Sequence, residues 1–210
     1  MSSYQFSASW FDGPVKDMWE QIIPQLKPKR ILEVGSYEGA SACYLIDKLA
    51  ADTDIVIHCI DSWEGGISHK AGGGFEADMN AVESNFNHNT SLAISNAKNK
   101  VELVVHKEFS DFSLAKLLST GKKNYFDFVY IDGSHEAPDV LCDAVLGFRL
   151  LRVGGLMAFD DYLWSERYDF GTDPIRCPKP AVDAFVNMYI RKLKIIPAPL
   201  FQIYVTKTSD

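Results

Sequence analysis

Short apolar runs alternate with amphipathic stretches along most of this 210-residue chain. The apolar runs predict strands over residues 29–34, 54–60, 101–106, 125–131 and 155–159. The amphipathic stretches predict a leading helix over 14–23, ended near Pro24, and further helices over 40–50, 76–94, 110–118, 138–151 and 180–193. Two final runs, 194–196 and 202–206, are joined by a short proline-containing turn and should pair as an antiparallel hairpin.

This alternation of strands and helices is typical of the α/β class. It predicts a single doubly wound domain over residues 1–210, with a mostly parallel seven-stranded sheet that carries helices on both faces. Residues 1–28 would form an N-terminal helical cap, and residues 29–207 would form the core. In such sheets ligands bind beyond the carboxyl ends of the strands, so the residues that follow each strand are the first candidates for chemistry.

Composition and charge narrow the function classes. The net charge of −7 disfavours a nucleic-acid interface, which needs clustered lysines and arginines to neutralise phosphates. No apolar run has the length of a membrane span, and residues 1–10 lack the pattern of a signal peptide, so we expect no membrane partner. The four widely spaced cysteines form no C-x-x-C pair, which favours reduced thiols and a cytoplasmic location.

The most informative segment covers residues 31–39. Ile-Leu-Glu-Val predicts a buried strand that ends in a glycine turn, Gly35-Ser-Tyr-Glu-Gly39, ahead of a helix. Glycines let the backbone turn sharply and approach a ligand without a Cβ in the way. The dinucleotide fingerprint G-x-G-x-x-G requires a second glycine where this chain has Tyr37, so the pattern disfavours a nicotinamide cofactor.

Acidic residues follow three further predicted strands. A carboxylate at the position of Asp61 can accept hydrogen bonds from two ribose hydroxyls of a nucleoside. Asp132 and the pair Asp160-Asp161 follow strands that should be neighbours, about 5 Å apart. Three ionised carboxylates so close together repel, so either some are protonated or a divalent cation lies among them.

These acids also have structural alternatives. A lone aspartate after a strand is more often a turn residue or a helix cap, and for Asp161 that role stays open. Asp160 and Asp161 would face opposite ways in an extended strand. Both reach one ion only if the strand has already begun to turn.

Together these motifs resemble class I S-adenosylmethionine-dependent methyltransferases, from about Lys29 to Lys207. Glu33-Val-Gly-Ser-Tyr-Glu-Gly39 looks like their E-x-G-x-x-x-G motif, and the acid after the second strand and the terminal hairpin are similar too. The resemblance implies a Rossmann-like sheet with strand order 3-2-1-4-5-7-6, counted along the chain. Tyr130-Ile-Asp-Gly-Ser-His135 and the later Phe159-Asp-Asp-Tyr162 resemble the small metal-dependent O-methyltransferases of the macrocin and catechol types.

The resemblance carries over to particular residues. It implies a divalent cation, Mg²⁺, held by Asp132, Asp160 and Asp161. It also implies S-adenosylmethionine bound by Glu33, Gly35, Ser36, Gly39, Asp61, Ser62, Trp63, Ser110 and Asp132. Asp61 would bind the ribose, and Ser62 and Trp63 would lie near the adenine. Lys107-Glu-Phe-Ser110 departs from the Gly-x-Ser often seen after the third strand, so only Ser110 carries over.

The implied reaction is methyl transfer to a hydroxyl of a small molecule, such as a sugar, a glycoside or a phenol. A cation that touches the acceptor hydroxyl would lower its pKa, and a base would take the proton. The candidate catalytic residues are Asp132 and His135, because an imidazole titrates near neutrality. The alternative is that His135 only caps its loop or joins the metal shell.

Two segments are candidates for the acceptor pocket. One is 63–75, which holds His69 and a glycine-rich loop. The other is 162–180, with Trp164, Arg167, Tyr168, Phe170 and Arg176. The alternative is that these aromatic side chains only pack the segment onto the body of the protein. The leading segment 4–19 covers the site or mediates a homodimer, and the residues leave both open.

Two other functions compete with this interpretation. One is an NAD-type oxidoreductase, which the absent second glycine disfavours. The other is a non-catalytic S-adenosylmethionine-binding module. Such a module would typically lose acids at the site, and all of them are present in this sequence.

Overall fold

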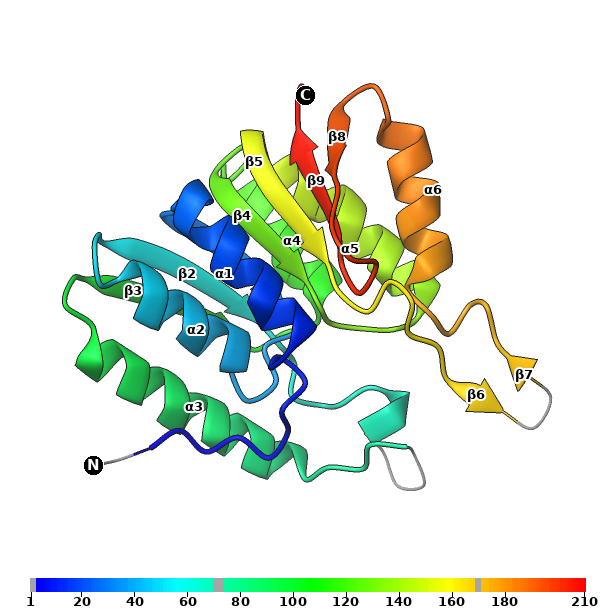
Figure 1. The fold of residues 1–210 in the computed structure, drawn as a ribbon. Helices are drawn as coiled ribbons and strands as arrows, with labels where there is room; N and C mark the ends of the chain where they lie inside the picture. The colour runs from blue at the N-terminus through cyan, green and yellow to red at the C-terminus, as the bar shows by residue number, and fades with distance from the viewer. Residues whose placement is uncertain (1–2, 70–73, 169–170) are drawn as a thin grey trace.

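Seven strands form one sheet in the order β3-β2-β1-β4-β5-β9-β8, shown in Figure 1. The computed structural model describes residues 3–69, 74–168 and 171–210. The strands are β1 Arg30–Val34, β2 Ile55–Ile60, β3 Val101–His106, β4 Phe126–Ile131, β5 Leu151–Phe159, β8 Leu193–Ile196 and β9 Ile203–Lys207. β1 to β5 pair in parallel, and β9 runs antiparallel to both β5 and β8. The fold class, strand order and terminal hairpin expected from the sequence are confirmed.

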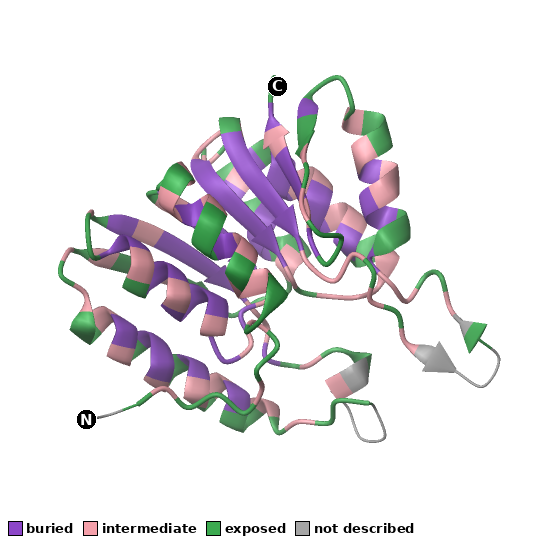
Figure 2. Ribbon diagram, in the orientation of Figure 1, coloured by how far each residue is buried: buried purple, intermediate pink, exposed green. Residues whose placement is uncertain are grey.

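Helices cover both faces of the sheet. They are α1 Pro14–Leu26, α2 Ala40–Leu49, α3 Met79–Asn96, α4 Ser110–Ser119, α5 Ala137–Leu150 and α6 Lys179–Tyr189. Residues of α1, α2 and α3 share one apolar core with the first face, and residues of α4, α5 and α6 share another with the second face. Successive residues of β1 divide between the two cores, Ile31 in the first and Leu32 in the second. Figure 2 shows how the central strands are buried between the two helical layers.

Several element boundaries differ from the expectation. Helix α1 continues through Pro24 and ends at Leu26, and the capping residue Lys27 has a left-handed backbone conformation just before Pro28. A proline in the last helical turn removes only one backbone hydrogen bond, and the buried Trp19 and Ile23 hold the helix against the sheet. Helix α6 ends at Tyr189 because Leu193 already pairs with Lys207 in the sheet.

Strand β5 begins four residues earlier than the sequence indicated. The pairing with β4 shifts between Phe126 and Phe128, so an irregularity accommodates Gly154 and Gly155 within the strand. The loop expected over 65–75 contains a short 3₁₀ helix, η1 Ile67–His69, and its residues 70–73 lie outside the described part. A two-stranded ribbon, β6 Arg167–Tyr168 with β7 Gly171–Thr172, was not predicted.

The leading segment lies along the body of this chain. The Tyr4 hydroxyl donates to Asp47 at 2.7 Å, and the Ser7 amide donates to Glu38 Oε2 at 2.6 Å. The Asn89 side chain accepts from the Gln5 amide and donates to the Gln5 carbonyl. The segment therefore packs beside the glycine turn that contains Glu38, and the homodimer stays a prediction.

None of the helices in the described part of the chain is both long and apolar enough to span a membrane. All four cysteines are free thiols, and two of them, Cys43 and Cys59, are buried.

The carboxyl of Asp143, on α5, is buried without a hydrogen-bond partner. Its exposed fraction is 1%, and neither oxygen is bonded to any described group. Burial raises its pKa to about 7, an effect that the nearby Ser110 hydroxyl only partly offsets. The folded state therefore favours the protonated acid, and ionisation of Asp143 costs stability.

We expect Asp143→Asn to stabilise the protein more at pH 8 than at pH 5. Below the unfolded pKa of about 3.9, Asp143 is protonated in both the folded and the unfolded protein and costs no stability. As the pH rises toward 7, the unfolded state ionises first and the wild type loses stability. Between pH 5 and pH 8 the difference in free energy of unfolding between variant and wild type should therefore widen by at most about 3 kcal/mol. Urea denaturation at both pH values measures it. The exposed Asp52→Asn is the control, and an equal gap at both pH values would contradict the prediction.

Candidate active site

The parallel register brings the ends of four strands to one edge of the sheet. Val34 lies opposite both Ile60 and Ile131, and Ile131 lies opposite Phe159. The ladder continues one residue further, because Gly35, Asp132 and Asp160 donate their amides to Ile60, Val34 and Ile131 at 2.8–2.9 Å. The residues after β1, β2, β4 and β5 therefore meet, as the sequence predicted.

The two glycines of the turn are required by the protein's own atoms. Gly35 has φ +83°, and a Cβ there would lie 2.0 Å from the backbone oxygen of Asp132. Gly39 has φ +80°, and a Cβ there would lie 3.0 Å from the Phe86 ring. The sequence explained these glycines by the approach of a ligand, whereas in the structure the space is filled by the neighbouring loop and by α3.

Glu33 shapes the glycine turn from inside the protein. Its side chain is fully buried and accepts hydrogen bonds from the hydroxyls of Ser36 and Ser41, both at 2.5 Å. Burial raises the pKa of Glu33, and the two hydroxyls oppose that rise. The carboxyl thus joins the end of β1 to the start of α2, and direct contact with a cofactor stays a prediction for Glu33 and Ser36.

Asp61 ties the end of β2 to the glycine turn. Its Oδ2 accepts from the backbone amides of Ser36 and Tyr37 at 3.0 and 2.9 Å. Its Oδ1 accepts from the Trp63 amide at 2.8 Å. A carboxylate can accept about four hydrogen bonds, so Asp61 keeps capacity for a ribose hydroxyl.

The residues predicted near an adenine differ in how open they are. Trp63 is only 6% exposed, packs against Phe86 with ring centroids 4.9 Å apart, and donates its indole N–H to the Tyr37 carbonyl. Ser62 is half-buried and its hydroxyl accepts from the Glu64 amide. Ser110 begins α4 and lies near Asp143. Trp63 therefore supports the turn, while Ser62 is more accessible.

The acids after β4 and β5 meet at a phenol that the sequence did not single out. The Tyr130 hydroxyl lies 3.0 Å from Asp132 Oδ2 and makes a shorter hydrogen bond with Asp160 Oδ2. A phenol has one proton, so it donates to one of these carboxyls at a time. The available signal was the spacing, since Tyr130 and Asp132 are two residues apart and share one face of the strand.

The acid pair lacks a cationic partner among the described residues. No described lysine or arginine forms an ion pair with Asp132 or Asp160. Burial, and after it the neighbouring carboxylates, raise the pKa of Asp132 well above its usual range and the pKa of Asp160 to about 6. Oxygen donors with excess negative charge suit a hard divalent cation.

The third predicted ligand, Asp161, turns toward His135 instead. His135 Nε2 lies 2.9 Å from Asp161 Oδ2, and the imidazole packs on Trp164 with ring centroids 4.0 Å apart. Asp161 has φ +54°, so the strand has turned by this residue. In the described part of the chain no three His, Cys, Asp or Glu side chains converge as metal ligands. Two of the three predicted ligands thus share Tyr130, and the third pairs with the candidate base.

An aromatic cluster of Trp10, Tyr37, His69 and Phe75 lies beside the glycine turn. Trp10 packs 4.9 Å from Tyr37 and 5.7 Å from Phe75, and His69 stacks on Tyr37 at 5.7 Å. Burial lowers the pKa of His69, and the nearby His135 imidazole lowers it further. Trp10 remains 54% exposed. The sequence included His69 among the candidates but not Trp10.

The second candidate segment, 162–180, is joined to the loop that holds His135. Arg176 pairs with Glu136 at 3.1 Å and with Glu166 at 2.9 Å, and the Ala137 amide donates to the Ile175 carbonyl. Phe170 lies outside the described residues. This segment therefore places Trp164 against His135 and leaves the other expected contacts as predictions.

A family model described as a methyltransferase domain matches residues 32–162. The chain belongs to this methyltransferase family. Its match covers the glycine turn, Asp61 and all three acids after β4 and β5.

A curated relative of this methyltransferase is named an O-methyltransferase. A probable caffeoyl-CoA O-methyltransferase 3 of Dictyostelium discoideum is 26% identical over 154 residues, which are 73% of this chain and 51% of that protein. The chain thus spans about half the length of that relative. The predicted resemblance to class I methyltransferases of the O-methylating type is confirmed.

Solved structures share the fold. An O-methyltransferase from Bacillus cereus in complex with SAH has a TM-score of 0.63 at 15% identity, covering 93% of this chain and 82% of that one. TomG from Streptomyces achromogenes, an O-methyltransferase in tomaymycin synthesis solved with SAM, has a TM-score of 0.60 at 17% identity, covering 93% and 80%. At this identity the likeness establishes the fold.

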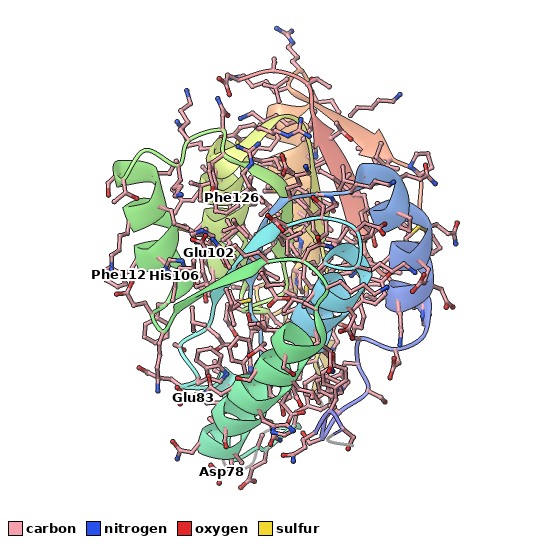
Figure 3. All side chains as sticks on the ribbon, turned by 90° about the vertical axis from the view of Figure 1, so that its left-hand side faces the viewer. Asp78, Glu83, Glu102, His106, Phe112 and Phe126 are labelled. Atoms are coloured by element: carbon pink, nitrogen blue, oxygen red, sulfur yellow. The ribbon has the colours of Figure 1, made fainter. Side chains whose placement is uncertain are left out.

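Within the described residues, the side chains of the strand histidines of the methyltransferase are not hydrogen-bonded to the acids, although His106 ends β3 at this edge and its carbonyl accepts from the Asp61 amide at 3.1 Å. His58 Nδ1 lies 2.9 Å from His106 Nε2, and burial lowers the pKa of His58 to about 4. Figure 3 labels both His106, the last residue of β3, and the exposed Phe112 of α4. A hollow of about 450 Å³ is lined by Glu108, Phe109, Phe112 and Lys116. His58 and His106 thus pair with each other, as a structural role predicts.

We expect Gly35→Ala to lower the free energy of unfolding by about 3 kcal/mol or more, because a new Cβ would overlap the Asp132 carbonyl. The control is Gly121→Ala, which has φ +85° but open space around it, and should lose only about 1–2 kcal/mol from the left-handed conformation. Urea denaturation measures both. Equal losses would show that the contact with Asp132 does not matter.

Proposed function

We propose that this protein transfers the methyl group of S-adenosylmethionine to a hydroxyl oxygen of a small molecule. The observation that carries the proposal is the meeting of the glycine turn and Asp61 with Asp132, Asp160 and His135 at one sheet edge. The names of the O-methyltransferase relatives, and the SAH and SAM in two solved ones, support it. The cofactor would lie against the glycine turn, with Asp61 on its ribose.

The reaction balances without a further reagent. The acceptor oxygen attacks the methyl carbon, an O–C bond forms, the S–C bond breaks, and S-adenosylhomocysteine leaves with the electron pair. One proton must leave the acceptor hydroxyl. The protein contributes by holding the two reactants in line and by accepting that proton.

His135 is the proposed base. Because the Asp161 carboxylate accepts from Nε2, the neutral ring carries its hydrogen there and keeps the lone pair on Nδ1. Trp164 restricts the ring, and Asp161 would stabilise the imidazolium that forms. Asp161 thereby fixes the tautomer, which is the role of the carboxylate in a histidine–aspartate pair.

The acids can hold a divalent cation, with Mg²⁺ as our proposal. Asp132 and Asp160 would supply the first oxygen donors, and Asp161, whose Oδ2 pairs with His135, would contribute its other oxygen, Oδ1, only after its side chain moves toward them. When bound, such an ion would lower the pKa of the acceptor hydroxyl and offset the charge of the buried carboxylates. The substitution Asp160→Ala would remove one of these donors.

The acceptor is proposed to be a sugar, a glycoside or a phenol. The aromatic cluster beside the glycine turn and Trp164 beside His135 offer flat apolar surfaces. Both surfaces suit a ring that presents a hydroxyl toward His135. The caffeoyl-CoA relative supports an aromatic ring among these alternatives.

Isothermal titration and a methyl-transfer assay test the function together. We expect S-adenosylhomocysteine to bind and NAD not to bind, because the turn lacks the second glycine of the dinucleotide fingerprint. Labelled S-adenosylmethionine with Mg²⁺ should methylate members of a panel of catechols, phenolic glycosides and sugars. Binding of NAD alone would favour an oxidoreductase, and cofactor binding without transfer to any class would favour a binding module.

We expect His135→Gln to lower the methyl-transfer rate by about 10²–10⁴-fold at neutral pH and to remove the limb of the pH–rate profile that reports the base. S-adenosylhomocysteine affinity should stay the same, since His135 faces Asp161. The control is His88→Gln, a half-buried residue of α3 whose ring is hydrogen-bonded to the Ser3 carbonyl and not to the acids. A full rate with an unchanged profile would exclude His135 as the base.

A further inference from the structure

A buried phenol lies under the two acids. Tyr130 is 1% exposed, and its hydroxyl reaches Oδ2 of both Asp132 and Asp160 from the interior of the sheet. Asp160 Oδ1 accepts separately from the Asp161 amide at 2.8 Å. The phenol therefore bridges the two carboxyls at one oxygen each and leaves other lone pairs of both groups available.

Gln202 fixes the phenol from behind. Its Oε1 accepts from the Trp19 indole N–H at 3.2 Å and from the Tyr204 hydroxyl. An indole N–H can only donate, so the amide oxygen must face Trp19 and the amide nitrogen must face Tyr130. Gln202 Nε2 then donates toward the Tyr130 oxygen at 3.4 Å. The Tyr130 proton is consequently directed to the acids.

The ring itself has little freedom. The Trp19 ring packs edge-on against it with centroids 4.8 Å apart. The two carboxylates, which share one hydroxyl as hydrogen-bond partner, would repel each other and rotate apart if no donor lay between them. The phenol supplies that donor from a fixed position.

We propose that Tyr130 is a positioning residue that holds Asp132 and Asp160 as a preassembled pair of oxygen donors for a divalent cation. The proposal rests on the cation of the proposed function. Tyr130 touches neither the methyl group nor the acceptor in this role. It acts through the two carboxyls, as outer-shell partners of metal ligands do.

Mn²⁺ titration of the substrate-free protein, followed by electron paramagnetic resonance, tests the proposal. We expect Tyr130→Phe to weaken Mn²⁺ binding by at least about 10-fold, the usual effect of losing such a partner, and Asp160→Ala to weaken it further. Tyr204→Phe is the matched control, because Tyr204 is a buried tyrosine bonded to the same glutamine without touching either acid. It should bind Mn²⁺ as the wild type does.

A second variant covers a failure of Tyr130→Phe to fold, which circular dichroism would reveal. Gln202→Met keeps the Tyr130 phenol but removes the amide that donates to its oxygen. Mn²⁺ binding should therefore weaken less than in Tyr130→Phe. Wild-type affinity in a folded Tyr130→Phe overturns the proposal. If that variant does not fold, wild-type affinity in Gln202→Met overturns it. Equal weakening in Tyr204→Phe also overturns it, because the effect would then be general loosening.

The two proposals fail in different ways. If the wild type binds no Mn²⁺ yet transfers methyl groups in excess chelator, the inference about Tyr130 is overturned and the methyltransferase function stands. If Mn²⁺ binding depends on Tyr130 as expected but no acceptor class is methylated, the positioning role stands and the reaction is overturned.

Discussion

The contact between the backbones of Gly35 and Asp132 sets the layout of the site. β1 lies between β2 and β4. Its last residue, Val34, accepts from the Asp132 amide after β4, and the next residue, Gly35, donates to the carbonyl of Ile60 at the end of β2. From this point α2 continues on one face of the sheet and α5 on the other. The chain therefore diverges here, and a ligand crevice opens at such a divergence. A side chain at Gly35 would force the two loops apart and separate the cofactor side from the acids.

Strand β4 carries an acid near each end, and their surroundings differ. Asp127, near the start, accepts from Arg30 and Arg152. Burial alone would raise its pKa, but the hydrogen bonds from these arginines outweigh burial and lower it to about 2. Asp132, just past the end, has a raised pKa, and its neighbours are the Tyr130 phenol and the Asp160 carboxyl. The acid at the start of the strand is thus paired with arginines, whereas the acid after its end has no arginine or lysine partner among the described residues.

The sequence was sufficient for the positions of the strands and of the acids, because both follow from short local patterns, whereas the strand order came from the family resemblance. Apolar runs locate the strands, and acids directly after them must lie at the shared edge. The hydrogen-bond partners of the acid side chains could not be predicted from the sequence. Asp161 turns to His135 because its backbone is left-handed, and no pattern in the sequence specifies that conformation.

The helix boundaries failed for a related reason. Pro24 is a strong local stop signal, yet tertiary packing of Trp19 and Ile23 carries α1 past it. Leu193 fits the helical period of α6, yet its pairing with Lys207 assigns it to the sheet. In both cases contacts between distant parts of the chain override a local preference.

The support of the acid pair comes from both ends of the chain. Trp19 belongs to α1 and Gln202 directly precedes β9, yet the two are hydrogen-bonded under Tyr130. The family match, residues 32–162, includes the glycine turn and the acids but neither of these two residues. The shared part of the fold therefore brings the acids to one edge, while flanking segments of this chain determine how the phenol between them is held.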